Sequence, residues 1–273
     1  MNGVCDDFVS TDGLSVRVDE TRLTLTIDRP SHRNALTDSS MAAFIDNLEI
    51  AATHDELRVI VIRGAGADFC SGFDIVGRNS ARDTRPRTAS IQRRMPMQAN
   101  RLIPLILETQ LPIVCAVRGW AVGIGAQIAL AADFTVTSRD ARWWYPFIPR
   151  GFTPDSGSTW LVPRVVGRVR ARELLILGRK LSGTEAVEWG MAHSVVDDAD
   201  VDAGVDEIAG TLADGPTVAM GLTKWLLNSG HSKSLDQHLT DEALAMELSS
   251  RSPDFREGLA AFTQHRAPTF EGR

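Results

Sequence analysis

The sequence predicts an α/β fold, and three observations support this class. Short apolar runs typical of strands alternate along the chain with segments whose apolar residues recur at helical spacing. Two of these runs lead into glycine-bearing turns, as strands do before a tight connection to a helix. The chain of 273 residues is 43% hydrophobic, which is enough to bury a full core in one large domain with an appendage. The pattern alone leaves open both a doubly wound sheet and other α/β arrangements.

The first predicted elements are a β-hairpin and a helix. Val16 to Val18 and Leu23 to Ile27 alternate apolar and polar side chains, and the four residues between them supply polar turn chemistry. A helix is expected from about Ser39 to Thr53, because apolar residues recur there at helical spacing. Thr37 or Asp38 can cap its first turn.

The middle of the chain continues this alternation, and its last part is helical. In chain order we expect a strand Val59 to Ile62, a helix near Met95 to Glu108, a strand Ile113 to Val117, a helix from Gly125 to Ala131 and a strand Phe134 to Thr137. Beyond about residue 205 only helical spacing remains, over Leu222 to Leu227, Leu235 to Leu248 and Phe255 to Phe262.

Composition excludes several classes of function. A formal net charge of -6 and a pI near 5.5 argue against broad attraction to nucleic acid or to a membrane surface. The longest apolar stretch, Trp120 to Ala132, is too short for a membrane span. Cys5, Cys70 and Cys115 form no CxxC pair, and the histidines show no metal spacing, so neither a disulfide framework nor a metal site is expected. We expect a cytoplasmic protein, since the first residues also carry no apolar secretion segment.

The two glycine-bearing turns are the most informative feature of the chain. They span residues 67–75 (ADFCSGFDI) and residues 119–127 (GWAVGIGAQ). Glycine lets the backbone approach a ligand closely, and a helix that starts at such a turn points unpaired N–H groups at one spot. Two turns of this kind can bind one oxyanion. The alternative for each turn alone is a strand-to-helix connection that needs glycine only for its dihedral angles.

Together with three further blocks, these turns resemble the crotonase family, also called the enoyl-CoA hydratase/isomerase family. The further blocks are residues 29–36 (RPSHRNAL), 154–158 (PDSGS) and 252–258 (SPDFREG). They follow the family's order and approximate spacing over nearly the whole chain. The resemblance implies a crotonase-like ββα spiral core with the acyl-CoA site in residues 1–204. It implies a C-terminal helical oligomerisation region in residues 205–273.

The resemblance also implies a ligand and an assembly. The ligand is an acyl-CoA thioester, as in fatty acid metabolism, and coenzyme A enters as part of the substrate, with no separate cofactor. The assembly is a homotrimer or a dimer of trimers. By motif position, the peptide N–H groups of Ser71 and Ile124 are expected to hold the thioester oxygen, which lowers the barrier to an enolate.

The catalytic carboxylates that hydratases of this family use are both replaced. Gln127 stands at the position of the first glutamate and Phe147 at the position of the second. A glutamine can hold water but cannot exchange its proton, and phenylalanine can do neither. Ordinary hydration is therefore not expected.

Asp155 matches the aspartate that isomerases and dehalogenases of the family use. It can shuttle a proton along an acyl chain or attack an aromatic ring as a nucleophile. Its alternative is a helix cap, because PDSG precedes an apolar run. The dehalogenase role is weakened because no histidine lies between His54 and His193.

Several other residues are expected to bind substrate: Arg33, Ser71, Gly72, Phe73, Asp74, Trp143 and Phe147. The aromatic ones predict a wide apolar pocket for a cyclic, aromatic or branched acyl group. The segment from residue 78 to residue 101 carries seven arginines and one acid, either as an exposed loop or as a lid near the phosphates of coenzyme A. They are Arg78, Arg82, Arg85, Arg87, Arg93, Arg94 and Arg101.

These residues favour an acyl-CoA enzyme that stabilises a thioester enolate and transfers a proton as an isomerase, with Asp155 as base. Two alternatives stay open. One is a catalytically silent acyl-CoA binder, since both usual acids are missing. The other is a thioester hydrolase or dehalogenase that uses Asp155.

Overall fold

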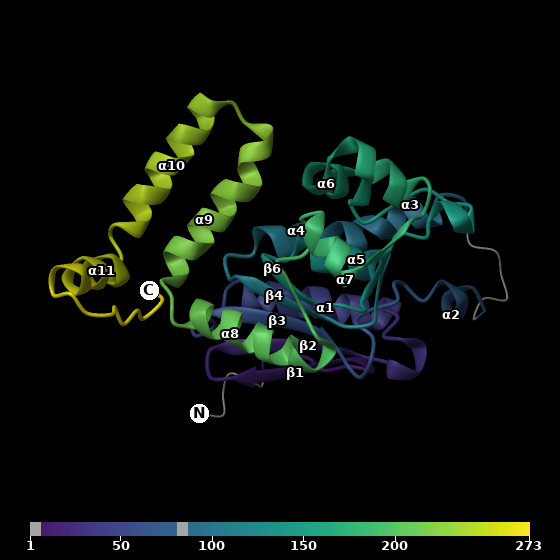
Figure 1. Ribbon diagram of the computed structural model, residues 1–273, viewed down its shortest axis with the longest axis horizontal. Coiled ribbons are helices and arrows are strands. Elements are labelled where there is room, and N and C mark those ends of the chain that lie inside the picture. The colour runs from purple at the N-terminus through teal and green to yellow at the C-terminus, as the bar shows by residue number, and fades with distance from the viewer. Residues whose placement is uncertain (1–6, 81–86) are drawn as a thin grey trace.

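The structure is a computed structural model that describes residues 7–80 and 87–273 (Figure 1). Cys5, Arg82 and Arg85 lie outside these residues. A six-stranded sheet forms the centre of the molecule. Its strands, in spatial order, are β1 (Gly13–Asp19), β2 (Arg22–Asp28), β3 (Val59–Gly64), β4 (Ile113–Val117), β6 (Phe134–Ser138) and β9 (Ser194–Val196). β1 and β2 form the predicted antiparallel hairpin, and the remaining neighbours pair in parallel.

Helices cover both faces of this sheet because its strands are apolar on both sides. Ile60 and Ile62 of β3 face a core shared with α1 (Asp38–Ala51), α4 (Ala99–Glu108) and α5 (Ile124–Ala131). Val59 and Val61, which alternate with them, face a second core against α8 (Val201–Ala213). All four side chains are fully buried. The predicted α/β class is confirmed.

A second, three-stranded sheet stands beside the first, and the sequence pattern did not predict it. It consists of β5 (Trp120–Val122), β7 (Arg142–Trp144) and β8 (Lys180–Ser182). β5 and β7 pair in parallel, whereas β7 and β8 pair antiparallel. Two isolated bridges, Cys70 with Ala121 and Leu36 with Phe73, connect the first glycine turn to this sheet on one side and to the opening block 29–36 on the other.

Shorter helices connect these layers, and the helix predicted near Met95 starts later than expected. The shorter helices are α2 (Ile75–Ser80), α3 (Ser90–Arg94) and α7 (Gly183–Glu188), with the longer α6 (Ser158–Leu175). Residues Met95–Met97 form a 3₁₀ turn, and α4 begins at Ala99. No helix in the described part of the chain is long and apolar enough to cross a membrane.

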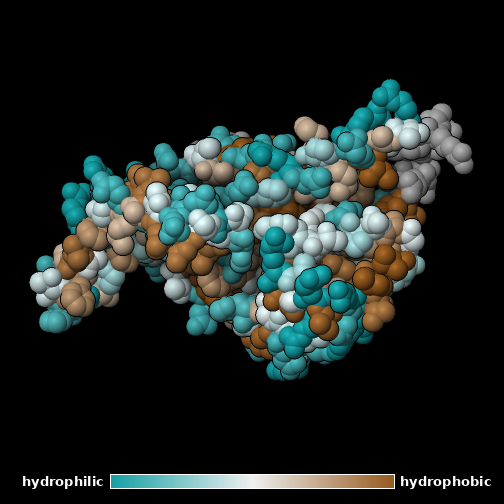
Figure 2. All heavy atoms as spheres, turned by 90° about the horizontal axis from the view of Figure 1, so that it is seen from above, coloured by the Kyte–Doolittle hydropathy of each residue, from teal (hydrophilic) through white to brown (hydrophobic). Residues whose placement is uncertain are grey.

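The last three helices form an arm that leaves the sheets, at the left of Figure 1. They are α9 (Thr217–Ser229), α10 (Leu235–Ser249) and α11 (Pro253–Thr263), in agreement with the predicted helical tail. The predicted division at residue 205 falls inside α8, which packs on β3, β4 and β6. Apolar side chains gather on the arm's surface in Figure 2, and Phe262 at its end is 82% exposed.

Candidate active site

The first glycine turn lies between the opening block and the small sheet, and this position fixes the direction of its N–H groups. The Leu36 N–H donates to the Gly72 carbonyl, and the Asp74 N–H donates to the Leu36 carbonyl, both at 2.8 Å. In a parallel bridge of this kind, the residue between the two bonded ones directs its own N–H to the opposite side. The Phe73 N–H therefore points away from Leu36.

The opposite side of the turn is occupied by the end of β5. The Val122 N–H donates to the Cys70 carbonyl at 2.9 Å. A Cβ added to Gly72, whose φ is +100°, would lie 3.1 Å from the Val122 carbonyl oxygen. Only glycine suits this conformation and this close approach. Phe73 consequently faces the start of the second glycine turn.

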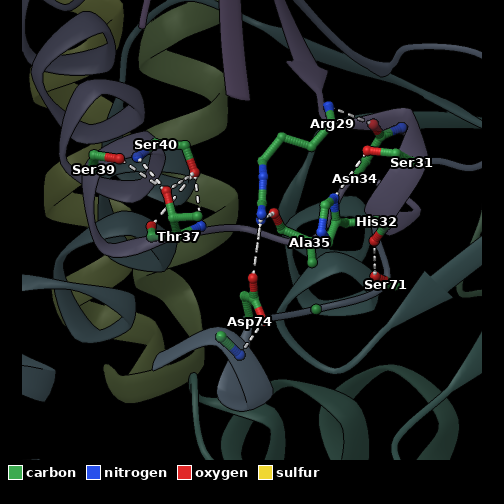
Figure 3. Close-up of polar contacts among 12 residues, drawn as sticks. Arg29, Ser31, His32, Asn34, Ala35, Thr37, Ser39, Ser40, Ser71 and Asp74 are labelled. Atoms are coloured by element: carbon green, nitrogen blue, oxygen red, sulfur yellow. Dashed lines mark hydrogen bonds and ion pairs between the residues drawn. The ribbon is translucent and has the colours of Figure 1, made fainter. Parts of the chain in front are cut away.

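Ser71 cannot serve as the predicted oxyanion donor. Its peptide N–H donates to the Arg33 carbonyl at 2.9 Å. Its Oγ donates to the His32 carbonyl at 3.1 Å (Figure 3). Both groups are thus committed to the opening block. The predicted role of the Ser71 N–H is therefore wrong, because this group is bonded to Arg33.

The opening block is a scaffold that holds this turn in place. Asn34 is fully buried, and its Nδ2 donates to the Ala65 carbonyl at 2.9 Å while its Oδ1 accepts from the Arg29 N–H at 2.9 Å. The Arg29 guanidinium forms an ion pair with Asp74 at 3.2 Å (Figure 3). These contacts were not predicted from the sequence, although the RPSHRNAL motif marks the residues that make them.

Asp74 is part of this scaffold and does not line the cavity onto which both glycine turns open. Its carboxylate accepts from the Gly77 N–H at 2.8 Å and pairs with Arg29. The hydrogen bond from Gly77, followed by the Arg29 contacts, holds the pKa of this carboxyl below its usual range. The prediction that Asp74 binds substrate is therefore corrected to a role in fixing the turn.

The second glycine turn starts α5 and presents its first N–H group. Gly123 has φ +55° and donates to the Trp144 carbonyl at 2.8 Å. Ile124 is the first residue of α5, and its N–H has no acceptor among the described residues. A Cβ added to Gly125 would lie 2.5 Å from the Cys70 carbonyl oxygen, so only glycine lets the two turns approach this closely.

The two turns open onto one cavity of about 490 Å³. Ser71, Gly72 and Phe73 come from the first turn, as predicted for substrate contacts, and Gly123 and Ile124 come from the second. The other apolar walls are Met41, Ile75, Ile91, Met95, Ala99, Val122, Pro146, Phe147 and Phe152. Asp155 is the only carboxylate residue that lines this cavity among the described residues. The arrangement brings the Ile124 N–H, the first glycine turn and one acid together in an apolar space, which suits stabilisation of an oxyanion together with proton transfer.

Asp155 is a candidate base and not a helix cap. The N-cap of α6 is Gly157, and no side chain caps this helix. The Asp155 carboxylate accepts a hydrogen bond from the Ser156 hydroxyl at 2.7 Å. Burial raises the pKa of this carboxyl, and the Ser156 hydrogen bond offsets part of the effect. A carboxyl with a raised pKa that lines a cavity suits proton exchange.

Gln127 and Phe147, at the two glutamate positions, differ in their placement. Gln127 is fully buried behind the cavity wall and does not line it. Its Oε1 lies 3.5 Å from the Tyr145 hydroxyl, and its Nε2 has no hydrogen-bond partner among the described residues. Phe147 lines the cavity, where its ring packs edge-on against Phe152 at 5.6 Å. Neither side chain offers a titratable group to the cavity.

Trp143 and Arg33 do not line the cavity either. Trp143 is 1% exposed and its indole N–H donates to the Thr137 hydroxyl at 3.3 Å, so its predicted place in the acyl pocket is wrong. It belongs to the inward face of β7. Arg33 lies on the surface, 6.0 Å above the Trp120 ring and 3.9 Å from Asp68. Its predicted contact with coenzyme A stays a prediction.

The arginine-rich segment, residues 78–101, forms one wall of the cavity. The side chains that it contributes are apolar or uncharged. Ser90 and Ile91 of α3, with Met95 and Gln98, line the cavity. Arg101 is engaged elsewhere, because it pairs with Glu49 of α1 at 2.8 Å. The predicted contact of the other arginines with phosphates stays untested.

Three kinds of comparison relate this chain to known proteins. The model of the enoyl-CoA hydratase/isomerase family matches residues 18–273. The 1,2-epoxyphenylacetyl-CoA isomerase of Escherichia coli (strain K12) is 37% identical over 92% of this chain and 95% of that protein. The 4-chlorobenzoyl coenzyme A dehalogenase-1 of an Arthrobacter species is 32% identical over 88% of this chain and 86% of that protein. A crystal structure of an enoyl-CoA hydratase from Polaromonas sp. JS666 matches with a TM-score of 0.87 at 29% identity, over 94% of this chain and 99% of that chain.

Proposed function

Because the chain belongs to the enoyl-CoA hydratase/isomerase family, we propose that it is an acyl-CoA isomerase in which two backbone N–H groups stabilise a thioester enolate and Asp155 moves the proton. The crotonase-type fold predicted from the sequence is confirmed by the family and structure matches. The observation that carries the proposal is the convergence of Phe73, Ile124 and Asp155 on one apolar cavity.

The oxyanion site consists of the Phe73 and Ile124 N–H groups. The bridge between Leu36 and Phe73 directs the Phe73 N–H away from Leu36, and we place the thioester oxygen on that side, beside the second glycine turn. The Ile124 N–H lies at the N-terminus of α5, where the positive end of the helix dipole adds to its attraction for an anion. A thioester oxygen placed between them gains negative charge as the enolate forms, and each donor of this kind contributes about 3 kcal/mol to the transition state.

The proton transfer is a two-step exchange at carbon. The Asp155 carboxylate removes a proton from a carbon of the acyl group, and the electron pair of that C–H bond moves through the acyl chain onto the thioester oxygen. The protonated Asp155 then returns the proton to a different carbon as the electron pair moves back. Substrate and product are therefore isomers, and no water is consumed.

The acyl group that suits the cavity is aromatic or cyclic. Phe147 and Phe152 form a wall from one side, and Met41 and Met95 line the space with adaptable side chains. The relative from Escherichia coli acts, by its name, on a phenylacetyl-CoA epoxide, which supports a ring-bearing acyl group. Hydration is not proposed, because Gln127 and Phe147 replace the carboxylates expected for it and neither brings a titratable group to the cavity.

A second candidate is dehalogenation of an aromatic acyl-CoA, which the similarity to the Arthrobacter dehalogenase favours. In that case Asp155 attacks a ring carbon and halide leaves. A catalytically silent acyl-CoA binder is the remaining alternative, since the two N–H donors also serve binding.

A panel of straight, branched, cyclic and aromatic acyl-CoA thioesters separates these functions. Isomerase activity yields a product of unchanged mass with a shifted double bond or opened epoxide, and we expect it for ring-bearing substrates. Release of halide would instead establish the dehalogenase, and release of free coenzyme A the hydrolase. Tight binding of thioesters without any turnover across the whole panel would establish the silent binder and refute the proposal.

A further inference from the structure

A buried amide next to the cavity has no hydrogen-bond partner for its nitrogen, and it belongs to Gln127 of α5. This side chain is fully buried, and its Nε2 makes no hydrogen bond within the described residues. Its Oε1 lies 3.5 Å from the hydroxyl of Tyr145, which is also buried. Buried polar groups are almost always hydrogen-bonded, because an unpaired one costs the free energy of its lost hydration. An unpaired amide at this position therefore needs a physical reason.

The segment in front of this amide is the part of the cavity wall that carries Asp155. We call residues 152–157 the wall loop. Phe152, Asp155 and Ser156 of this loop line the cavity, whereas Gln127 does not. A Cβ added to Gly157 would lie 4.0 Å from the Gln127 Nε2 atom. The wall loop thus has the cavity on one side and the unpaired amide on the other.

The wall loop is strained and weakly held. Ser156 has φ +55°, a conformation that residues other than glycine seldom adopt and that is often found at functional sites. Within the described residues, only one N–H of the loop donates to a backbone carbonyl, from Phe152 to Phe147 at 3.2 Å. Gly151 before the loop and Gly157 at its end both have positive φ and tolerate large changes of dihedral angle. The loop can therefore move while it breaks few hydrogen bonds.

One carbonyl of the wall loop is free to accept a hydrogen bond from the amide behind it. The Ser156 carbonyl accepts none within the described residues. The carbonyls on either side of it are engaged. That of Asp155 accepts from the Ser158 N–H at 2.9 Å, and that of Gly157 accepts from the Leu161 N–H, also at 2.9 Å. A movement of the loop away from the cavity would pair the free carbonyl with the unpaired amide and satisfy both groups.

We propose that Gln127 is a positioning residue for Asp155: a ring that fills the cavity presses the wall loop back, and the Ser156 carbonyl then accepts a hydrogen bond from the Gln127 amide. The inference rests on the proposed function, which supplies the ring-bearing acyl group and makes Asp155 the base. Because the Ser156 hydroxyl donates to the Asp155 carboxylate at 2.7 Å, the new bond holds both residues in place. Coenzyme A without an acyl group leaves the cavity empty and does not move the loop. The Gln127 amide thus couples occupation of the cavity to the position of the base.

Calorimetric titration with phenylacetyl-CoA and with coenzyme A tests this coupling. Gln127→Met keeps the length of the side chain and removes the donor. It is made together with Tyr145→Phe, because the tyrosine hydroxyl would otherwise lose its partner, and Tyr145→Phe alone is the matched control. Relative to this control, we expect the phenylacetyl-CoA affinity of the double variant to fall about tenfold, since a buried hydrogen bond is lost only in that complex. Coenzyme A affinity should stay within about twofold, and the urea midpoint should not fall, because the free protein loses only an unpaired amide.

Unchanged phenylacetyl-CoA affinity of the double variant would overturn the proposal. An equal loss for both ligands with a lower urea midpoint would also overturn it, because that result indicates a purely structural role of Gln127. If the double variant does not fold, a crystal structure of the unmodified protein with phenylacetyl-CoA decides. The Gln127 Nε2 atom should then lie within about 2.7 to 3.2 Å of the Ser156 carbonyl oxygen, and an amide that is still unpaired would refute the proposal.

The titration needs no turnover, so its result is independent of the reaction. A protein whose Gln127 amide favours the acylated ligand but which converts no thioester refutes only the proposed function. A protein that isomerises ring-bearing thioesters but binds both ligands equally well with and without the Gln127 amide refutes only this inference.

Discussion

The peptide N–H of Ser71 donates to the carbonyl oxygen of Arg33 at 2.9 Å, and this bond joins two segments that are 38 residues apart in the sequence. It fixes the first glycine turn against the opening block. The bridge between Leu36 and Phe73 extends this contact further along the turn. The consequence is that Phe73, not Ser71, turns its N–H away from the opening block. The site therefore depends on a scaffold contact that contains no reacting group.

Replacement of Ser71 by alanine should affect stability and not catalysis. The substitution removes the Oγ hydrogen bond to the His32 carbonyl and keeps the backbone bond to Arg33. We expect the free energy of unfolding to fall by about 1 kcal/mol and kcat to stay within about twofold of its original value. Urea denaturation and steady-state kinetics measure both quantities. A large loss of kcat at unchanged stability would show that the Ser71 side chain takes part in the reaction.

Ile124→Pro tests the second N–H donor, because proline at the first position of a helix removes that N–H and is otherwise well tolerated. We expect kcat/KM to fall by about 10² to 10³. Ile124→Ala keeps the N–H and serves as the control. If both variants lose activity to the same degree, the side chain and not the N–H is responsible, and the oxyanion assignment fails.

Asp155→Asn should strongly lower turnover while coenzyme A affinity is retained. Loss of a positioned base costs about 10² to 10⁴ in rate, and the asparagine keeps the size of the side chain. Single-turnover kinetics and calorimetry measure the two effects. Ser156→Ala, which removes only the hydrogen bond to Asp155, should have a much smaller effect. Full activity of the asparagine variant would exclude Asp155 as the base.

The pH dependence of kcat should have an acidic limb that reflects Asp155. Burial raises its pKa above the usual value of 3.8, and the base acts only when ionised. Activity should therefore rise as the pH passes through this raised pKa and then level off. The limb should disappear in the residual activity of Asp155→Asn. An identical limb in that variant would assign it to another group.

The raised pKa of Asp155 also makes the stability of the fold depend on pH. A raised pKa in the folded state means that the folded protein binds the proton more tightly than the unfolded chain does. The contribution of Asp155 to stability is thus most favourable below pH 3.8 and is lost as the pH rises through the folded-state pKa. Asp155→Asn should accordingly unfold at the same or a higher urea concentration than the original protein at neutral pH, which denaturation curves can check.

The apolar arm should mediate assembly into the expected trimer or dimer of trimers. Leu259 and Phe262 of α11 are 54% and 82% exposed, which is costly in water unless another copy covers them. Sedimentation should show a trimer or larger, and Leu259→Glu with Phe262→Glu should shift it to smaller species. Leu177→Glu, at a site 76% exposed near the end of α6, is the control. A monomer before any substitution would refute the expected assembly.

The local pattern was sufficient for the long elements of the fold. β3 and β4 are continuous apolar runs, and the capped helix after Thr37 has its apolar residues on one side, so sequence alone locates them to within a few residues. β7, β8 and β9 have only three residues each, too few for a period to be detected. The placement of Trp143 was wrong for this reason, since only pairing with β5 and β8 decides which face it takes.

The site could be predicted at the level of segments but not of single atoms. Both glycine turns and Asp155 were identified from their motifs, and they do meet at one cavity. Which N–H of the first turn points away from the opening block depends on its pairing with residues 33 and 36, a long-range contact that no local pattern encodes. The same holds for Asp74, whose carboxylate is engaged by an arginine 45 residues away.

The most direct test of the account is a crystal structure of Asp155→Asn with a ring-bearing acyl-CoA thioester bound in the cavity. We predict that the thioester oxygen lies within about 2.7 to 3.1 Å of both the Phe73 and the Ile124 nitrogen atoms, with the acyl ring against Phe147. A thioester oxygen that contacts neither nitrogen, with the acyl group outside the cavity, would contradict the central claim.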